Sequence, residues 1–576
     1  MRSLILSGVI VAGVSALVFG RQTSTSAGLD LPQLSYVTTA HQLGVVGYRD
    51  PFGAISPDGT RLAYTEGRFI RVVPIGGGAP ITLAPGEGQI RYLAWIDDST
   101  IAAEDVTASG RWWTYRIGAP GRLPFRDHTA NDWRQLTWRG DMGLAIQFTQ
   151  AGAALIRLRN DAVYTERING RPSWPLFRPS RVVCIIDARI TSPCGSPPLK
   201  FDVDRDVYGP IALSPDSNTV YFSSPNDRGM VELMAADLTT GRTRRLSNFS
   251  RDAYAPTVAA DGTVVFKVQT YRTHLADVAV AGGATRQLTT FQSETPSYHP
   301  TLPLIAFTYG TWRRIIDDAK YPDIAQEIGV VDVSQALPAG KPAEVLEDSD
   351  SEDQAMTWSP NGQWIAFHTH KDMSDDVWLR PADGKGPDKR ITFLGRGAEV
   401  GWPRWSPDGR TVLLNGARKS DGASVVYTIG VNQDTGETTS ELREIAVKGI
   451  AGEMGHAEWM PGSNTVIAVA KEGPGRNVIF TVPVGGGAAT VVHRYATEHD
   501  FAGLGVSTNG RFVAFAAPAP DGFYQIFVKT IGGATPAVQL TTDRSHKTQP
   551  TFSPDGARVA FTVWSYEAAF WSFKDR

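Results

Sequence analysis

The sequence predicts an all-β protein, a β-propeller of four-stranded blades, because one turn motif recurs along the whole chain. Clean copies of Ser-Pro-Asp-Gly begin at Ser56, Ser406 and Ser553, and near copies begin at Ser214 and Ser359. In such a turn proline presets one φ, aspartate bonds back to the backbone, and glycine takes the positive φ that closes a hairpin. Recurrence of one unit at a period of 20 to 50 residues is typical of repeat architectures.

The residues around each turn supply the strands of a blade. Residues 61–65, 364–368 and 558–562 follow a turn and alternate apolar with polar side chains, which is the pattern of a strand. A further strand follows, as at 525–529, and a short Gly-rich turn then leads to a fourth, as at 538–541. Four strands per repeat make one propeller blade.

The number of repeats predicts more than one ring. Counted from the serine position, with degenerate copies admitted, the repeats are anchored at residues 56, 96, 139, 214, 259, 299, 359, 406, 460, 507 and 553. The longest gap, from 139 to 214, has room for a cryptic blade at 160–205, so we expect eleven or twelve repeats. Propellers close with four to eight blades, so two rings are expected. We place a signal peptide at 1–27, the first propeller at 28–310 and the second at 311–576.

The two ends of the chain are expected to meet. The last repeat ends with the strand-like residues 569–573 and lacks a fourth strand, whereas residues 34–38 form a strand without a repeat of their own. Pairing of these segments would close the last blade and remove two exposed strand edges.

Composition and charge are those of an ordinary soluble protein. The chain has 576 residues, 42% hydrophobic and 20% charged, and a formal net charge of -3 with scattered Lys and Arg. Such a charge gives no broad attraction to nucleic acid or to acidic lipid. We therefore expect no nucleic-acid partner.

The N-terminal segment resembles a secretory signal. Arg2 is followed by an apolar run from Leu4 to Phe19 and then by polar residues up to Ala27. The run is shorter than the roughly 20 residues that span a bilayer, so cleavage is expected, with an uncleaved membrane anchor as the alternative. This predicts a periplasmic or secreted protein.

The two cysteines fit an oxidising compartment. Cys184 and Cys194 are the only cysteines of the chain and lie in one stretch that also contains Pro193 and Gly195. We predict a disulfide between them, and two free buried thiols are the alternative.

The repeat motif resembles the WD-like propeller repeats of the TolB family, most clearly at residues 358–362 and 405–410. The resemblance covers nearly the whole chain after the signal and extends to the propellers of prolyl oligopeptidase-like and tricorn-type proteases. It implies a periplasmic propeller that binds protein partners through its face. This chain departs from the TolB pattern in being longer, with more repeats, and in having no obvious separate N-terminal α/β domain.

Catalysis is not expected from the sequence. No Gly-x-Ser-x-Gly nucleophile elbow occurs, and the last repeat starts at Ser553, which leaves no room for an attached hydrolase domain. Ten histidines form no tight ligand motif, although His368 and His370 share a strand face and His456 and His499 have acidic neighbours. We predict no metal and no cofactor. The alternatives are a metal-dependent lyase or hydrolase sited in the channel, and an accessory propeller of a separately encoded protease.

The expected function is therefore binding of a protein partner in the cell envelope, or of a peptide or glycan. Residues shortly before each turn should lie near the mouth of the central channel, because the innermost strand runs into the turn. The candidate binding residues at these positions are Tyr208, Tyr254, Tyr298, Trp402, His456, Asp500 and Gln549.

Overall fold

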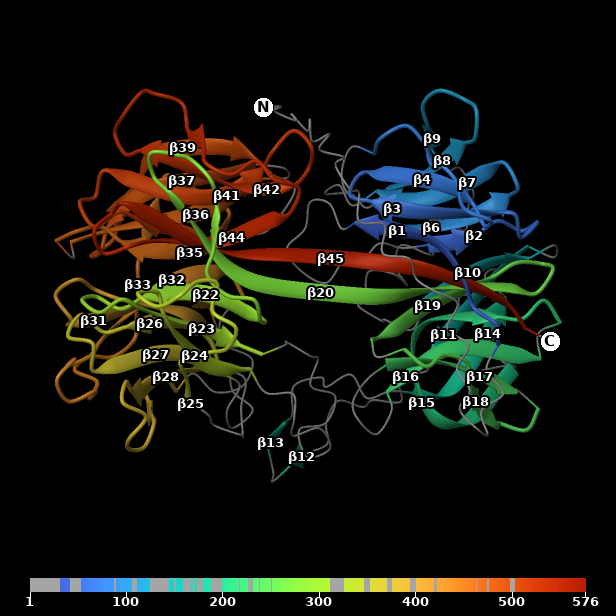
Figure 1. The fold of residues 1–576 in the computed structure, drawn as a ribbon, viewed down its shortest axis with the longest axis horizontal. Helices are drawn as coiled ribbons and strands as arrows, with labels where there is room; N and C mark the ends of the chain where they lie inside the picture. Colours follow the sequence, from blue (N-terminus) through green and yellow to red (C-terminus); the bar gives the residue numbers. More distant parts are fainter. Residues whose placement is uncertain are drawn as a thin grey trace, which may run out of the picture.

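A computed structural model describes most of the chain. The described residues are 32–41, 53–86, 90–105, 111–124, 144–149, 152–158, 167–168, 171–172, 180–187, 199–216, 218–225, 231–237, 239–249, 251–310, 326–346, 353–369, 376–393, 400–418, 422–462, 464–473, 476–497 and 503–575. Within these ranges all regular structure is β-strand, and nearly all of it lies in antiparallel sheets. The strands form two lobes that two long strands connect (Figure 1). The all-β propeller fold predicted from the turn motif is thus confirmed.

The first lobe contains sheets from the N-terminal part of the chain. Two of them have four strands each, in chain order: β2 (Gly53–Ile55), β3 (Arg61–Glu66), β4 (Phe69–Pro74) and β5 (Ile81–Thr82), then β6 (Ile90–Asp97), β7 (Thr100–Asp105), β8 (Arg111–Arg116) and β9 (Leu123–Pro124). A seven-stranded sheet follows: β10 (Leu144–Thr149), β11 (Gly152–Leu158), β14 (Ser180–Asp187), β15 (Leu199–Leu213), β16 (Thr219–Pro225), β17 (Val231–Asp237) and β18 (Thr243–Arg245). Within it β15 pairs with β14 up to Val207 and with β16 from Tyr208, so it joins two sets of four strands. The short strands β12 (Arg167–Ile168) and β13 (Arg171–Pro172) pair with each other.

The second lobe contains five four-stranded sheets. These are β22 (Ser293–Tyr298), β23 (Leu304–Tyr309), β24 (Glu327–Asp332) and β25 (Glu344–Leu346); β26 (Asp353–Trp358), β27 (Trp364–Thr369), β28 (Asp376–Pro381) and β29 (Lys389–Arg390); β30 (Val400–Trp405), β31 (Thr411–Ala417), β32 (Ser424–Gly430) and β33 (Arg443–Glu444); β35 (Glu453–Trp459), β36 (Thr465–Gly473), β37 (Arg476–Pro483) and β39 (Thr490–Ala496); and β40 (Leu504–Val506), β41 (Phe512–Pro518), β42 (Tyr524–Thr530) and β43 (Val538–Gln539). A short parallel pair, β34 (Val447–Lys448) with β38 (Gly487–Ala488), lies beside them.

The last sheet is shared by both lobes. It contains β1 (Ser35–His41), β19 (Ala253–Val258), β20 (Thr263–Ala279), β21 (Arg286–Gln287), β44 (His546–Phe552) and β45 (Arg558–Lys574). The long strands β20 and β45 pair without interruption, from Thr263 opposite Lys574 to Ala279 opposite Arg558. In the first lobe the strand order is β19, β20, β45 and β1, and in the second it is β44, β45, β20 and β21. Each long strand is therefore the second strand of one four-stranded set and the third strand of the other.

The first strands of these sets neighbour one another in two cycles. In the first lobe contacts run from β2 to β6, β10, β15 and β19 and back to β2, and in the second from β22 to β26, β30, β35, β40 and β44 and back to β22. Strands β22 and β23 precede residue 310, and they belong to the set whose first strand, β22, is part of the second cycle. The domain boundary at 310 and the total repeat count stay predictions, because parts of the chain lie outside the described residues.

The predicted meeting of the chain ends is confirmed. Ser35 lies opposite Ser572 and Tyr36 opposite Trp571, and the two aromatic rings are 5.7 Å apart between centroids. The structure adds that this pairing completes the set that β45 shares with β19 and β20. The set begun by β44 takes its fourth strand from β21 instead.

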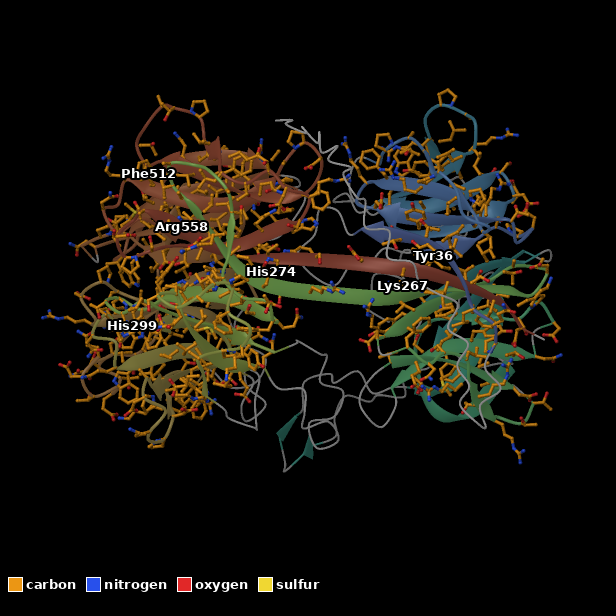
Figure 2. The ribbon with its side chains drawn as sticks, viewed as in Figure 1. Tyr36, Lys267, His274, His299, Phe512 and Arg558 are labelled. Carbon is orange, nitrogen blue, oxygen red and sulfur yellow. The ribbon has the colours of Figure 1, made fainter. Side chains whose placement is uncertain are left out.

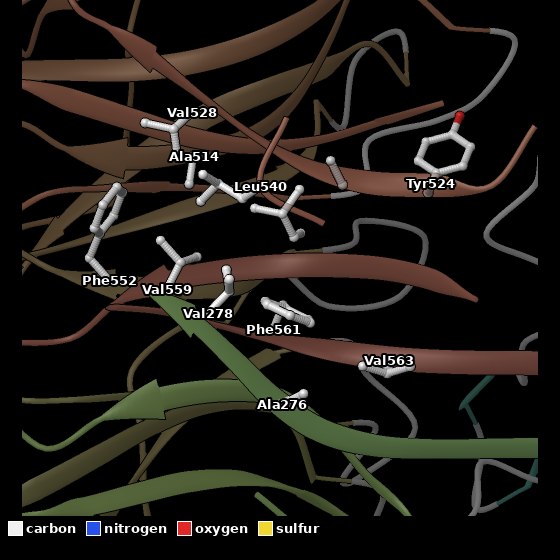
Figure 3. Packing of buried hydrophobic residues seen from close by; sticks show 12 residues of the cluster. Ala276, Val278, Ala514, Tyr524, Val528, Leu540, Phe552, Val559, Phe561 and Val563 are labelled. Atoms are coloured by element: carbon white, nitrogen blue, oxygen red, sulfur yellow. The ribbon is translucent and has the colours of Figure 1, made fainter. Parts of the chain in front are cut away.

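Buried side chains anchor the two long strands in both lobes. Val559, Phe561 and Val563 of β45 pack with Val278 of β20 in the second lobe (Figure 3), whereas Phe573 packs with Phe266 in the first. Asp277 in β20 is fully buried and accepts hydrogen bonds from Arg286 in β21 and Arg558 in β45. Along β20, Lys267 lies on the side of the first lobe and His274 lies where the strand reaches the second (Figure 2). Each of the two long strands therefore has one end buried in the first lobe and the other end buried in the second.

The recurring turn has the conformation that its sequence predicts. The serine hydroxyl donates to the Asp or Asn side chain two residues later at 2.5 to 2.8 Å, and it accepts from the amide five residues later at 2.9 to 3.0 Å. The glycine has a positive φ, as at Gly409 (69°) and Gly556 (70°), and its amide donates to the serine carbonyl. Where the serine is present, at residues 56, 214, 359, 406, 507 and 553, the motif thus connects the first two strands of a set through one hydroxyl group.

The turn carboxylates predict a loss of stability in acid. The hydroxyl of Ser553 and the amide of Ala557 lower the pKa of Asp555. A carboxylate with a lowered folded pKa stabilises the fold above its unfolded value of about 3.9, and this contribution disappears as the pH falls through the folded value. We expect Asp555→Asn to unfold at a urea midpoint that changes less than wild type between about pH 5 and pH 2. Asparagine already stands at this position of two repeats, as Asn361 and Asn509, so the variant should fold; an unchanged pH dependence would contradict the account.

A tryptophan directly before the turn connects neighbouring blades. The indole N–H donates to a backbone carbonyl of the preceding innermost strand in three places: Trp95 to Ala54 at 2.8 Å, Trp358 to Ser297 at 3.1 Å and Trp459 to Arg404 at 2.9 Å. Trp405 occupies the same position, but its buried indole nitrogen has no hydrogen-bond partner among the described residues. The Trp before the turn therefore both fills the space between blades and fixes their spacing.

Because Trp459 makes this hydrogen bond and Trp405 does not, replacing each of them gives a matched pair of variants. We expect Trp459→Phe to lower the free energy of unfolding by about 1 kcal/mol more than Trp405→Phe, because only the first loses a hydrogen bond. Both variants remove the same volume from a similar site, so urea unfolding of the two can be compared directly. Equal losses would show that the indole hydrogen bond contributes nothing.

Candidate binding site on the innermost strands of the second lobe

Most of the innermost strands share a bulge that alters the direction of their side chains. A register shift against the neighbouring strand occurs in β19, β22, β26, β30, β35 and β44, though not in β2 or β40. Five non-glycine residues, each four positions before a turn anchor, have a left-handed φ near 52° to 55°: Ala255, Thr295, Ala355, Trp402 and Gln549. Non-glycine residues adopt this conformation rarely, and it is least expected of a large aromatic residue. Trp402 is therefore the exceptional member of the set.

Two positions after the bulge, the innermost strands present one level of half-exposed side chains. We call this level, together with Trp402, the inner wall; its partly exposed members in the second lobe are Ser297, Thr357, Arg404, Glu458 and Thr551, whereas the equivalent Gly505 is buried. The residues that directly follow these positions, such as Trp358 and Trp405, are buried between neighbouring blades. The members of the inner wall are thus the positions of these strands that stay partly exposed. Among them Arg404 and Glu458 are the two charged residues, and they form an ion pair with 3.0 Å between Nε and Oε2.

Trp402 and His456, both predicted site residues, lie against each other. Their ring centroids are 4.2 Å apart in an edge-to-face arrangement, and they come from the adjacent strands β30 and β35. His456 is 5% exposed. Burial, reinforced by the Arg404 cation, holds the pKa of His456 well below its usual range. The imidazole is therefore neutral at physiological pH, with one nitrogen able to donate and the other to accept.

The polar atoms around His456 are incompletely paired. Neither ring nitrogen of His456 has a hydrogen-bond partner among the described residues, and the same holds for Oδ1 of Asn415. The amide nitrogen of Asn415 donates to the carbonyl of Gly455, which places it next to His456. Burial raises the pKa of Glu458, although Arg404 opposes this shift. The site thus combines an aromatic ring, a neutral imidazole, an amide and a compensated ion pair.

The other predicted residues lie in several places. Gln549 is on β44, where its Oε1 accepts from the Thr562 hydroxyl at 2.9 Å. Tyr298 packs against the core cluster between the shared sheet and β23, and burial raises its pKa. Tyr254 lies half-buried on β19 in the first lobe.

The remaining predicted residues are placed only in part. Tyr208 is placed by its backbone on β15, opposite Ser223, and Asp500 lies outside the described residues. Cys184 is on β14, but Cys194 lies outside the described residues, so the disulfide stays a prediction.

Arg404 and Glu458 are members of the site that sequence reasoning missed. Each lies two residues before its turn anchor, so its spacing from the turn is the sequence feature that could have identified it as a site residue. Of the histidines considered as metal ligands, His368 lies on β27 beside Gly401, whereas His370 and His499 fall outside the described residues. In the part of the chain that is described, no three His, Cys, Asp or Glu side chains come close enough together to hold a metal ion.

Similarity to known proteins is found among solved structures only. No protein-family model matches the chain, and no curated protein shows a significant match. A TolB-like protein from Agrobacterium tumefaciens is similar at 16% identity and a TM-score of 0.38, over 51% of this chain and 99% of that one. Oligogalacturonate lyase from Vibrio parahaemolyticus is similar at 15% identity and a TM-score of 0.33, over 57% of this chain and 90% of that one. The tricorn protease is similar at 12% identity and a TM-score of 0.29, over 87% of this chain and 62% of that one. At such identities the likenesses concern the fold alone, and the repeat motif had predicted propellers of these kinds.

Proposed function

We propose that this chain is an exported, non-catalytic binding module that holds a protein or a glycan of the cell envelope against the inner wall of the second lobe. The observation that carries the proposal is the contact of Trp402 with His456 beside the ion pair of Arg404 and Glu458. Aromatic residues and arginine are enriched at binding hot spots, because both combine a large contact area with polar atoms.

The position of the site supports recognition. Strand residues on a rigid ring are held by interblade hydrogen bonds, such as that from Trp459 to the carbonyl of Arg404. A preorganised surface loses less side-chain entropy when a ligand binds. A left-handed backbone at a residue as large as Trp402 is a strained feature, and such strain is found most often at functional sites.

The test is a comparison of ligand capture by wild type and two variants. The exported full chain is immobilised and exposed separately to envelope glycan fragments and to soluble envelope proteins, and bound material is identified by mass spectrometry. We expect a ligand that wild type retains, that Arg404→Ala loses, and that Phe393→Ala retains. Phe393 is the control because it is 71% exposed and lies three residues after β29, the strand at the opposite edge of its sheet from the innermost strand β26. A ligand retained equally by all three proteins would contradict the proposal.

Export is tested independently of binding. Residues 1–27 lie outside the described residues, and no helix in the part described is long and apolar enough to span a membrane. We expect protein recovered from producing cells to start near residue 28, as measured by intact mass and N-terminal sequencing. A full-length cytoplasmic product would contradict the export proposal and leave the binding proposal standing.

A further inference from the structure

We infer that the inner wall of the second lobe binds a neutral sugar unit of a glycan, with the indole of Trp402 as the stacking surface. The inference rests on the proposed function and names the ligand class for that site.

The first argument is the identity of the residue at the bulge. Among the residues with a left-handed φ at this position, Trp402 is the only aromatic one, and the others described are alanine, threonine and glutamine. Alanine, threonine and glutamine adopt the same backbone conformation at this position. The bulge therefore does not explain why a tryptophan stands at position 402. Trp402 is partly exposed on an innermost strand, so a ligand can reach part of the indole. A flat indole suits the apolar face of a sugar ring and leaves its N–H free for polar contact.

The second argument is the balance of charge. The guanidinium of Arg404 is bonded to Glu458 at 3.0 Å and to the carbonyl of Pro403 at 2.8 Å, so its charge is compensated inside the protein. His456 is neutral because it is buried. The other members of this level are the hydroxyl residues Ser297, Thr357 and Thr551. An anionic ligand would have to displace Glu458, whereas a neutral polyol meets three hydroxyl side chains and an ion pair that is already compensated within the protein.

The third argument is the set of unpaired polar atoms next to Trp402. Both ring nitrogens of His456 and Oδ1 of Asn415 are buried without a hydrogen-bond partner among the described residues. Buried polar atoms are nearly always paired, so each such group needs an explanation. A sugar hydroxyl can accept from one imidazole nitrogen and donate to Oδ1. Because these atoms are buried and the Trp402 ring contacts the imidazole, a hydroxyl that reaches them must shift side chains beside Trp402, and binding should therefore change tryptophan fluorescence.

The experiment is calorimetric titration of the exported full chain with neutral oligosaccharides, matched uronic-acid oligosaccharides and peptides. We expect binding of a neutral oligosaccharide, with a fluorescence change, and a loss of affinity of at least about tenfold in Trp402→Ala. Phe393→Ala should bind as wild type does. Trp402→Gly is a second variant that keeps the fold testable, because glycine adopts the left-handed φ without strain.

The outcomes separate this inference from the proposed function. Binding of a protein or peptide that depends on Trp402, without binding of neutral sugars, would overturn the inference and support the proposed function. Tighter binding of the uronic-acid series would also overturn the inference alone. Binding of neutral sugars that is unchanged in both Trp402 variants would overturn the inference and place the site elsewhere. No ligand dependent on either Trp402 or Arg404 would overturn both proposals.

Discussion

Replacement of Phe570 with alanine is expected to lower the free energy of unfolding of the first lobe by about 3 to 5 kcal/mol. Phe570 is 1% exposed and packs with Ile55, Leu62 and Val265 in one buried cluster. A methyl group at Gly53 would come within 2.4 Å of its ring, so the packing is close. The residue lies near the C-terminus, yet its cluster contains strands from the start of the chain. The replacement is expected to destabilise the first lobe this strongly because β45 extends into the core of that lobe.

The matched control is Phe561→Ala on the same strand. Phe561 is fully buried, but its cluster belongs to the second lobe (Figure 3). Hydrogen exchange followed by mass spectrometry should show faster opening of β2 and β3 in Phe570→Ala and of β41 and β42 in Phe561→Ala. Faster exchange in the second lobe alone for both variants would contradict the sharing of β45.

Replacement of Arg380 with alanine is expected to cost about 3 to 5 kcal/mol, because it leaves a buried carboxylate without its cation. The Arg380 side chain is 6% exposed and pairs with Asp353 at 2.8 Å, and the Asp353 side chain is fully buried. The same guanidinium pairs with Asp388 and donates to the carbonyl of Leu346. Arg380 thus joins β28 to the last residue of β25 and to the first residue of the innermost strand β26.

Arg418→Ala is the matched control for Arg380→Ala. Arg418 also makes two hydrogen bonds to one carboxylate, that of Glu444, but both side chains are about one-third exposed. Exposed pairs contribute about 1 kcal/mol or less. Urea unfolding that showed equal losses for the two variants would contradict the importance of burial at Arg380.

The repeat unit could be predicted from the sequence because its information is local. Proline, aspartate and glycine each act on the backbone of the turn itself, and the observed bonds of Ser406 and Asp408 follow from those residues alone. The pairing of residues 34–38 with 569–573 was also predictable, since residues 34–38 form a strand without a repeat of their own. Which set this pairing completes was not predictable, because the set begun by β44 takes its fourth strand from β21.

The sharing of β20 and β45 was not predicted, because the strand-like segments at 558–562 and 569–573 were read as separate strands. A signal was present: residues 558–574 contain no glycine, proline, asparagine or aspartate, so nothing in them ends a strand. Residues 263–279 likewise contain no glycine or proline. A strand without a turn residue has no reason to stop at the edge of one lobe.

The candidate site was predicted in part. The spacing from the turn placed Trp402 and His456 at equivalent positions of adjacent repeats, and these two rings are in contact. The pairing of Arg404 with Glu458 depends on which innermost strands are neighbours and on which side chains the blades leave uncovered. Burial of His456 also depends on its surroundings in three dimensions, which no single repeat encodes.

The most direct test of the account is a crystal structure of the exported chain with the oligosaccharide that binds best. The account predicts difference density for a neutral sugar ring on the indole of Trp402, within hydrogen-bond distance of His456 or Asn415. Density confined to another face of the protein, with the inner wall of the second lobe unchanged, would contradict it.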